Sequence, residues 1–349
     1  MDKRIALIDQ SALGGRASFY VGGEYAETDG RRFLTGQMFV EVYEPRKRKH
    51  DYPVVMFHGA GQTNMNWLQT PDGRMGWADY FVSQGFCVVL AEQPSRGRSA
   101  YHPAAEGPRI FHPLQVVRQR FTTDEGPWPQ AKQHTQWPDN GGDWEDYSFR
   151  QFAAAQVEYL PSNKRSQELV LAAGKELLEL LGPCILVTHS QAGPFGWLLA
   201  DACPEKVKAV IALEPTAPPF SVDQSSPIAK NYGLADLPLH FEPPVQSPAD
   251  FKLRLLPSPG EGLHAGWVLD EERSLPRLNM PILLVTSEAS YHAQFDHLLS
   301  YVMEQLGVRH DFVRLEDVDI RGNSHMMMLE KNNLEIADYL INWISDNGL

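Results

Sequence analysis

The sequence predicts an α/β fold, with a mostly parallel central sheet and helices on both of its faces. Strand-like and helix-like segments alternate along the 349 residues, which is the pattern of parallel strands joined by helical crossovers. Most of the strand-like segments are continuous apolar runs, as expected for strands that are buried on both faces. We expect buried strands at residues 52–57, 86–91, 184–188, 207–213 and 281–286, and a last strand at 310–315.

The first expected element is an antiparallel hairpin at one edge of the sheet. Residues 17–25 and 34–44 are both strand-like, and a turn-rich Glu-Thr-Asp-Gly sequence at 27–30 separates them. A free sheet edge of this kind is also a candidate surface for a homodimer. Helices are expected at 77–84 and, as the closing element, at 335–345.

Two long segments interrupt the alternation of strands and helices. Residues 104–165 are rich in Trp, Gln and Pro, and residues 216–279 contain ten prolines. Neither has enough patterned apolar sequence for a core of its own, and long loops in compact domains usually serve as lids or binding surfaces. We therefore expect both to pack over one end of the sheet. The predicted organisation is a first core part with the hairpin (1–103), a cap insertion (104–165), a second core part (166–215), a Pro-rich lid insertion (216–279) and a last core part (280–349).

The composition excludes several classes of protein. There are 31 Lys and Arg residues against 44 Asp and Glu, so the net charge of −13 argues against nucleic-acid and anionic-membrane partners. No apolar stretch approaches the roughly 18 residues of a membrane span. The apolar run near the N-terminus ends too early for a signal peptide. Three cysteines lie within apolar segments, which favours reduced thiols and a cytoplasmic protein.

The segment around Ser190 is the most informative part of the chain. A buried strand runs into a sharp turn at residues 189–191, and a helix follows with Pro194 in its first turn. A serine on such a turn is lifted to the carboxyl end of the sheet, where it can act as a nucleophile. The usual G-x-S-x-G pattern is degenerate here, because Thr188 and Ala192 occupy the flanking positions. The alternative is that Ser190 only caps the helix.

A serine nucleophile needs a base, and His325 is the best candidate among the twelve histidines. It follows the last expected strand on a Gly-Asn-Ser loop, which can place an imidazole over the edge of the sheet. His58 also ends a strand, but we expect it to orient the backbone of the loop that it begins. His292 and His297 are five residues apart and have no cysteine ligands nearby, so no zinc site is expected. We expect neither a metal nor a cofactor.

The sequence pattern alone does not decide which carboxylate would orient the histidine. Glu214 ends the strand after the serine, in an apolar setting between Leu and Pro, and Glu288 ends the next strand in a wetter setting. Asp296 lies eight residues beyond Glu288, within an expected helix. Either strand-end carboxylate could hold the imidazole tautomer and stabilise its charged form. A structural ion pair is the alternative for either glutamate.

The oxyanion of an acyl-transfer reaction needs backbone donors beside the serine. The amide of Gln191 lies at the start of the helix, where negative charge would develop. The second donor is expected in the loop after the His58 strand, where Gly59 and Gly61 permit a close approach. The Ala60 amide is the best candidate.

Taken together, these residues resemble the α/β-hydrolase superfamily. The resemblance rests on His58-Gly59, on the Glu-Gln-Pro-Ser-Arg-Gly-Arg-Ser string at 92–99, on the turn at Ser190 and on the late His325. More narrowly, residues 70–77 and the His-Ser-Gln turn are similar to a small branch typified by the bacterial esterase 713. This resemblance implies an α/β-hydrolase fold, carboxylester hydrolysis on a small-molecule ester or lactone, and a chain order of serine, acid and histidine.

The same resemblance bears on two site residues. In that branch the acid is a glutamate directly after the strand that follows the nucleophile, which implies Glu214 rather than Glu288. It also assigns the second oxyanion donor to Ala60, where the branch member carries cysteine. The substitution does not affect a backbone amide.

Three functions compete at this stage. The first is a serine carboxylester hydrolase that uses Ser190, His325 and Glu214, with the Ala60 and Gln191 amides as the oxyanion hole. The second keeps the fold and triad but opens lactones, cleaves C–C bonds or forms rings. The third is a hydrolase-fold protein that binds a ligand without turnover.

Overall fold

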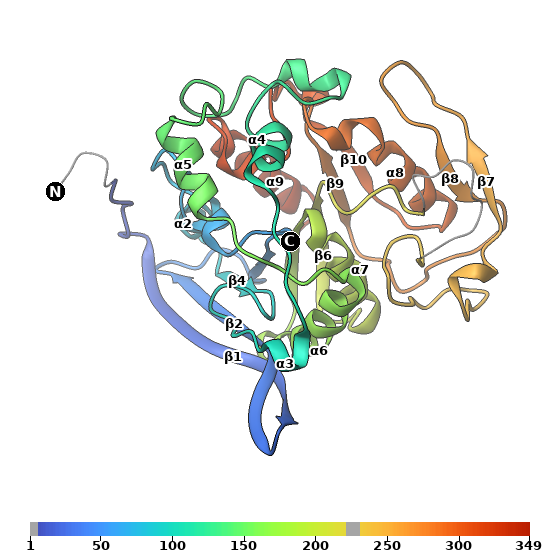
Figure 1. The fold of residues 1–349 in the computed structure, drawn as a ribbon, viewed down its shortest axis with the longest axis horizontal. Coiled ribbons are helices and arrows are strands. Elements are labelled where there is room, and N and C mark those ends of the chain that lie inside the picture. Colours follow the sequence, from blue (N-terminus) through green and yellow to red (C-terminus); the bar gives the residue numbers. More distant parts are fainter. Residues whose placement is uncertain (1–5, 221–230) are drawn as a thin grey trace.

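The computed structural model describes residues 6–220 and 231–349, so residues 1–5 of the N-terminal segment and 221–230 of the Pro-rich segment lie outside the described residues. The central feature is an eight-stranded sheet in the order β1-β2-β4-β3-β5-β6-β9-β10 (Figure 1). Neighbouring strands from β4 to β10 pair in parallel. The predicted α/β class with a mostly parallel sheet is therefore confirmed. The strands are β1 (Leu13–Thr28), β2 (Arg31–Pro45), β3 (Val54–Phe57), β4 (Val88–Glu92), β5 (Cys184–His189), β6 (Val207–Leu213), β9 (Ile282–Thr286) and β10 (Asp311–Arg314).

The hairpin at the edge of the sheet is longer than the sequence pattern predicts. β1 and β2 continue to pair beyond their apolar parts, up to Thr28 and Arg31. The two residues between them, Asp29 and Gly30, have φ angles of 51° and 67°. Positive φ at both positions is typical of the type I′ turn, whose twist matches that of the paired strands.

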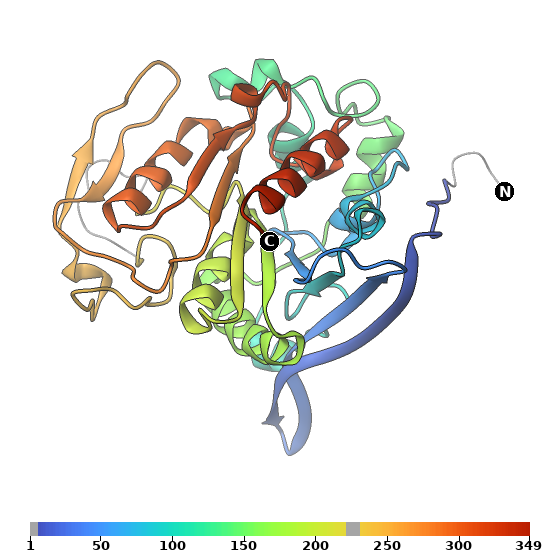
Figure 2. The ribbon, with the colours of Figure 1, turned by 180° about the vertical axis from the view of Figure 1, so that it is seen from behind.

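Helices cover both faces of the sheet (Figures 1 and 2). Side chains alternate along each buried strand, so Val55 and Phe57 of β3 face one cluster of buried residues while Val54 and Met56 face the other. The first cluster includes residues of α6, α7 and α8, and the second includes residues of α2 and α9. The helices are α1 (Met65–Leu68), α2 (Trp77–Gln84), α3 (Pro103–Glu106), α4 (Leu114–Phe121), α5 (Tyr147–Ala154), α6 (Asn163–Leu181), α7 (Gly193–Ala202), α8 (Asp296–Gln305) and α9 (Asn333–Asp346).

The described part of the Pro-rich segment forms a small sheet that the sequence pattern does not predict. β7 (Leu253–Leu256) and β8 (Gly266–Leu269) pair antiparallel and lie outside the main sheet (Figure 1). β8 packs on α8 so closely that a Cβ on Gly266 would lie 2.3 Å from a methyl carbon of Leu298. The apolar residues of this segment thus extend the core beside α8, and its assignment as a lid stays a prediction.

The described helices include none that combines the length and the apolar character needed to cross a membrane.

Candidate active site

Ser190 lies at the sharp turn between β5 and α7. Its φ of 56° is in the left-handed region, which costs a non-glycine residue on the order of 1–3 kcal/mol. The serine opens a short 3-10 turn, Ser190–Ala192, and lines a cavity of about 230 Å³. A strained serine raised between a buried strand and a helix has the local geometry of a nucleophile elbow.

The close packing around this turn depends on glycines that the degenerate motif does not reveal. A Cβ on Gly193 would lie 2.3 Å from the Cβ of Pro215. A Cβ on Gly196, one turn further along α7, would lie 2.9 Å from a methyl carbon of Val210. Both contacts join the helix to β6 and the residues after it, so these glycines allow the close approach that the flanking motif positions usually provide.

A chain of hydrogen bonds joins Ser190, His325 and Glu214. The Nε2 atom of His325 is 2.9 Å from the Oγ of Ser190, and its Nδ1 atom is 2.5 Å from the Oε2 of Glu214. Glu214 is fully buried, and it also accepts hydrogen bonds from the backbone N–H of Ser287 and the hydroxyl of Ser290. These three donors compensate the loss of water around the carboxylate.

The surroundings of His325 favour its neutral form. Burial lowers its pKa well below the usual value, and electrostatic interactions with His292, Arg120 and His112 act in the same direction. If Nδ1 carries the proton and donates it to Glu214, the lone pair of Nε2 faces the serine hydroxyl. That is the tautomer a general base requires.

The other two carboxylates that the sequence leaves open have different partners. Glu288 accepts a hydrogen bond from the backbone N–H of Gly322 at 2.8 Å and thereby supports the loop that leads to the histidine. Asp296 is 2.7 Å from the Nδ1 of His292. Of the three carboxylates, Glu214 is the one hydrogen-bonded to His325.

His292 lies directly against His325, which the sequence analysis did not anticipate. The two rings stack with their centroids 5.0 Å apart and their planes 7° from parallel. Burial lowers the pKa of His292, but the carboxylate of Asp296 more than offsets this, so the pKa lies above its usual value. Ligand atoms of Glu214, His292 and His325 lie within 4.8 Å of one another, which is close enough for a metal ion. However, Glu214 and His325 are already hydrogen-bonded to each other. The expected absence of a metal stays a prediction.

The loop after β3 brings Ala60 to the same cavity as Ser190 and Gln191. A Cβ on Gly59 would lie 3.0 Å from the Cβ of Ser190, so this loop passes as close to the serine as its backbone allows. His58 lies behind the loop, where burial lowers its pKa to about 3 and its Nδ1 is 3.1 Å from the carbonyl oxygen of Gly59. Its contacts agree with a role in orienting backbone.

Arg96 forms hydrogen bonds with both segments of this candidate oxyanion hole. Its guanidinium donates to the carbonyl oxygen of Gly59 at 3.2 Å and to the side-chain oxygen of Gln191 at 2.9 Å. It is 2% exposed, it lies over the ring of Tyr159, and no carboxylate pairs with it among the described residues. Burial lowers its pKa to about 9. Sequence reasoning missed this role, although Arg96 lies in the string at 92–99 that carries the family resemblance.

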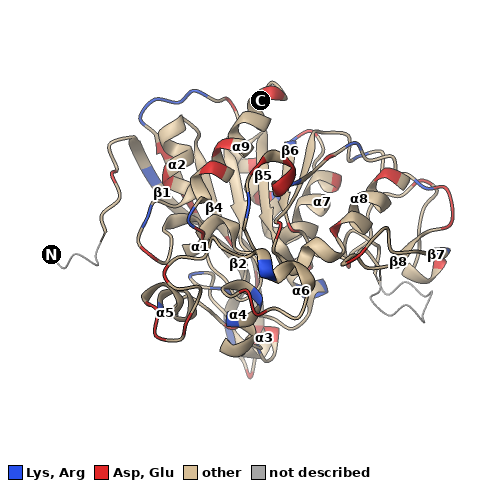
Figure 3. Cartoon of the chain, turned by 90° about the horizontal axis from the view of Figure 1, so that it is seen from above, with Lys and Arg blue, Asp and Glu red and all other residues tan. Residues whose placement is uncertain are grey.

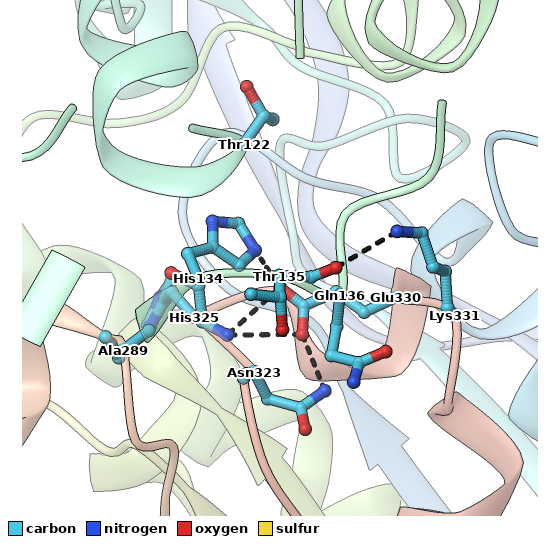
Figure 4. A network of polar contacts seen from close by, with 12 residues as sticks. Thr122, His134, Thr135, Gln136, Ala289, Asn323, His325, Glu330 and Lys331 are labelled. Carbon is cyan, nitrogen blue, oxygen red and sulfur yellow. Dashed lines mark hydrogen bonds and ion pairs between the residues drawn. The ribbon is translucent and has the colours of Figure 1, made fainter. Parts of the chain in front are cut away.

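A second buried network holds the loop that carries His325 (Figure 4). Glu330 accepts hydrogen bonds from the side chain of Asn323 at 2.7 Å and from the backbone N–H of Ser324 at 3.0 Å. The Nε2 of His134, from the segment expected as a cap, lies 2.7 Å from the same carboxylate. Glu330 thereby holds the two residues immediately before the histidine, and His134 in turn holds Glu330.

Comparisons with known proteins agree with this architecture. Residues 54–339 match the family model described as "Alpha/beta hydrolase family". The chain is 40% identical over 334 residues to the "Probable secreted lipase phiG" of Fungal sp. (strain ATCC 74256), covering 93% of this chain and 88% of that protein. A solved structure of a "Novel Bacterial Esterase" superposes with a TM-score of 0.66 at 21% identity and covers 99% of both chains. The chain therefore belongs to the alpha/beta hydrolase family and is a hydrolase of the esterase kind.

Proposed function

We propose that this hydrolase cleaves carboxylic esters through a Ser-His-Glu triad of Ser190, His325 and Glu214. The observation that carries the proposal is the continuous hydrogen-bonded chain from the serine Oγ through both ring nitrogens to the buried carboxylate. The serine lines the cavity, where a substrate carbonyl can reach it. A serine that merely capped the helix would need neither partner.

The reaction follows from this geometry in two stages. Ser190 attacks the ester carbonyl while His325 takes the hydroxyl proton, and Glu214 stabilises the imidazolium. The amides of Ala60 and Gln191 would bind the oxyanion, each supplying about 3–4 kcal/mol of the barrier reduction. The imidazolium then protonates the leaving alcohol. A water molecule, deprotonated by the same ring, releases the acyl group from the serine.

A fluorophosphonate probe tests the nucleophile. We expect the folded wild-type protein to be labelled and the Ser190→Ala variant, checked for an unchanged melting temperature, to remain unlabelled. Labelling of Ser190→Ala would reject this serine, and an unlabelled wild type would favour a ligand-binding protein. A panel of aryl esters, alkyl esters and lactones then separates ester hydrolysis from lactone opening by the same triad.

Two further expectations from the sequence belong to this proposal. The free cysteines Cys87, Cys184 and Cys203 are all buried, which agrees with a reducing cytoplasmic environment. The fungal relative is named as secreted, so fractionation of the source cells is the deciding measurement, and recovery from the medium contradicts a cytoplasmic location. Among the strands that the structure describes, β1 pairs only with β2, so its other edge is the proposed homodimer surface, which light scattering tests.

A further inference from the structure

The wall of the active-site cavity differs in charge from the rest of the molecule. The chain has 44 Asp and Glu residues against 31 Lys and Arg, and the acidic positions are spread over its helices and loops (Figure 3). Nevertheless, none of the described residues that line the cavity is an Asp or a Glu. The basic side chains on its wall include His112, Arg120 and His292.

Arg120 is the residue that gives this wall a permanent charge. It lies in the last turn of α4, with its guanidinium carbon 4.7 Å from the ring centroid of Tyr291. Tyr291 in turn places its hydroxyl 3.5 Å from the Nε2 of His325. The guanidinium is thus separated from the base of the proposed triad by a single aromatic ring.

Arg120 has no anionic partner within the described parts of the chain, residues 6–220 and 231–349. The contrast with its neighbour on the same helix is direct, because Arg118 pairs with Glu125 at 2.7 Å and also donates to the carbonyl oxygen of Gly142. Arg109, which precedes the helix, pairs with Glu158. A planar guanidinium with unused donors is suited to bind a carboxylate through two parallel hydrogen bonds.

We propose that the cavity selects small esters that carry a second, anionic group, with Arg120 binding that group. A half-ester of a short dicarboxylic acid has this chemistry. At about 230 Å³ the cavity lies below the roughly 300–1,000 Å³ of sites for drug-sized ligands, which favours a short substrate over a long acyl chain. This inference rests on the proposed ester hydrolysis and names the substrate class of the same site.

A matched pair of substrates tests the inference. The kcat/KM of the wild type is measured for monomethyl succinate and for dimethyl succinate, which differ by one negative charge. We expect the half-ester to be preferred by at least about tenfold. In Arg120→Gln the ratio of the two kcat/KM values should fall by about 10- to 100-fold, as expected for the loss of a charge-assisted hydrogen bond. Free succinate should inhibit the wild type competitively and the variant weakly.

Arg118→Gln is the matched control, because it removes a positive charge from the same helix without touching the cavity wall. Its substrate ratio should remain within about twofold of the wild-type ratio. A wild type that does not prefer the half-ester, or an unchanged ratio in Arg120→Gln, would overturn the inference while leaving ester hydrolysis intact. Hydrolysis of neither substrate by folded protein that also fails to react with fluorophosphonate would instead overturn the proposed function.

Discussion

Two buried histidine–glutamate pairs meet at the loop of residues 322–325. In one, the Nδ1 of His325 is 2.5 Å from Glu214, and in the other the Nε2 of His134 is 2.7 Å from Glu330. Both glutamates are fully buried. The residue types, the burial and the distances are nearly the same. The two pairs differ in the group that lies within hydrogen-bond distance of the other ring nitrogen of the histidine.

The second nitrogen of His134 faces a carbonyl oxygen, that of Thr123 at 3.2 Å. With acceptors at both nitrogens, the doubly protonated ring is favoured: burial lowers the pKa of His134, but Glu330 more than offsets this and the net shift is upward. The second nitrogen of His325 faces the hydroxyl of Ser190 instead, and its pKa is lowered by burial and by neighbouring positive charges. The pKa of a buried histidine beside a glutamate is therefore raised or lowered according to its other neighbours, and the lowered pKa of His325 suits its proposed role as a base.

Replacing each histidine should give the largest difference in kcat between the two pairs. In His325→Ala the kcat for an aryl ester should fall by about 10⁴- to 10⁶-fold with the fold intact, because no base remains for the serine. In His134→Ala the folded protein should keep kcat within about tenfold of wild type while its stability falls. Steady-state kinetics with a thermal melt on the same samples distinguishes them. Equal loss of kcat in both variants would show that the distinction is wrong.

Replacing Glu214, the carboxylate of the proposed catalytic pair, should have the next largest effect. Glu214→Gln should lower kcat by about 10⁴-fold, because an amide can donate to Nδ1 and hold the ring in the wrong tautomer. Glu288→Gln, on the adjacent strand end, is the matched control and should change kcat by less than about tenfold. If the control were the more damaging of the two, Glu288 would be the acid.

Replacing the carboxylate of the structural pair should act on stability. Glu330→Gln removes the carboxylate that raises the pKa of the buried His134 and bonds Asn323 and Ser324, which should lower the free energy of unfolding by about 3 kcal/mol. Chemical denaturation measures this change. An unaltered midpoint would mean that the network in Figure 4 contributes little to the fold.

The pH dependence of stability should carry the smallest signal. The pKa of His134 lies above 6.5 in the folded protein, so the native state binds more protons than the unfolded state between 6.5 and that higher value. Its stabilising contribution is complete below pH 6.5 and is lost as pH rises through the folded pKa, with a slope of at most about 1.4 kcal/mol per pH unit. Denaturation of wild type and His134→Gln across this range should show a steeper fall in wild type. Parallel curves would contradict the ion pair.

Some features of the site follow from residues that are adjacent in the chain, and others depend on contacts between distant residues. The buried strands around Ser190 follow from apolar runs, and the sharp turn follows from residues that are adjacent in the chain. Glu214 and Glu288 could not be separated in this way, because both follow neighbouring parallel strands. The distinction depends on the partners that each meets, such as the Gly322 amide that bonds Glu288.

The sequence by itself determined the fold class, the buried strands and the position of the serine at a sharp turn. Each of these depends on neighbours within a few residues. Only the tertiary structure decided that Arg96 and Arg120 have no carboxylate partner among residues 6–220 and 231–349. It also decided that His292 stacks on His325 and that the described part of the Pro-rich segment forms a second small sheet. The physical reason is that pairing, burial and local charge depend on groups far apart in the chain. Their effects on chemistry arise only when folding brings those groups within a few ångströms.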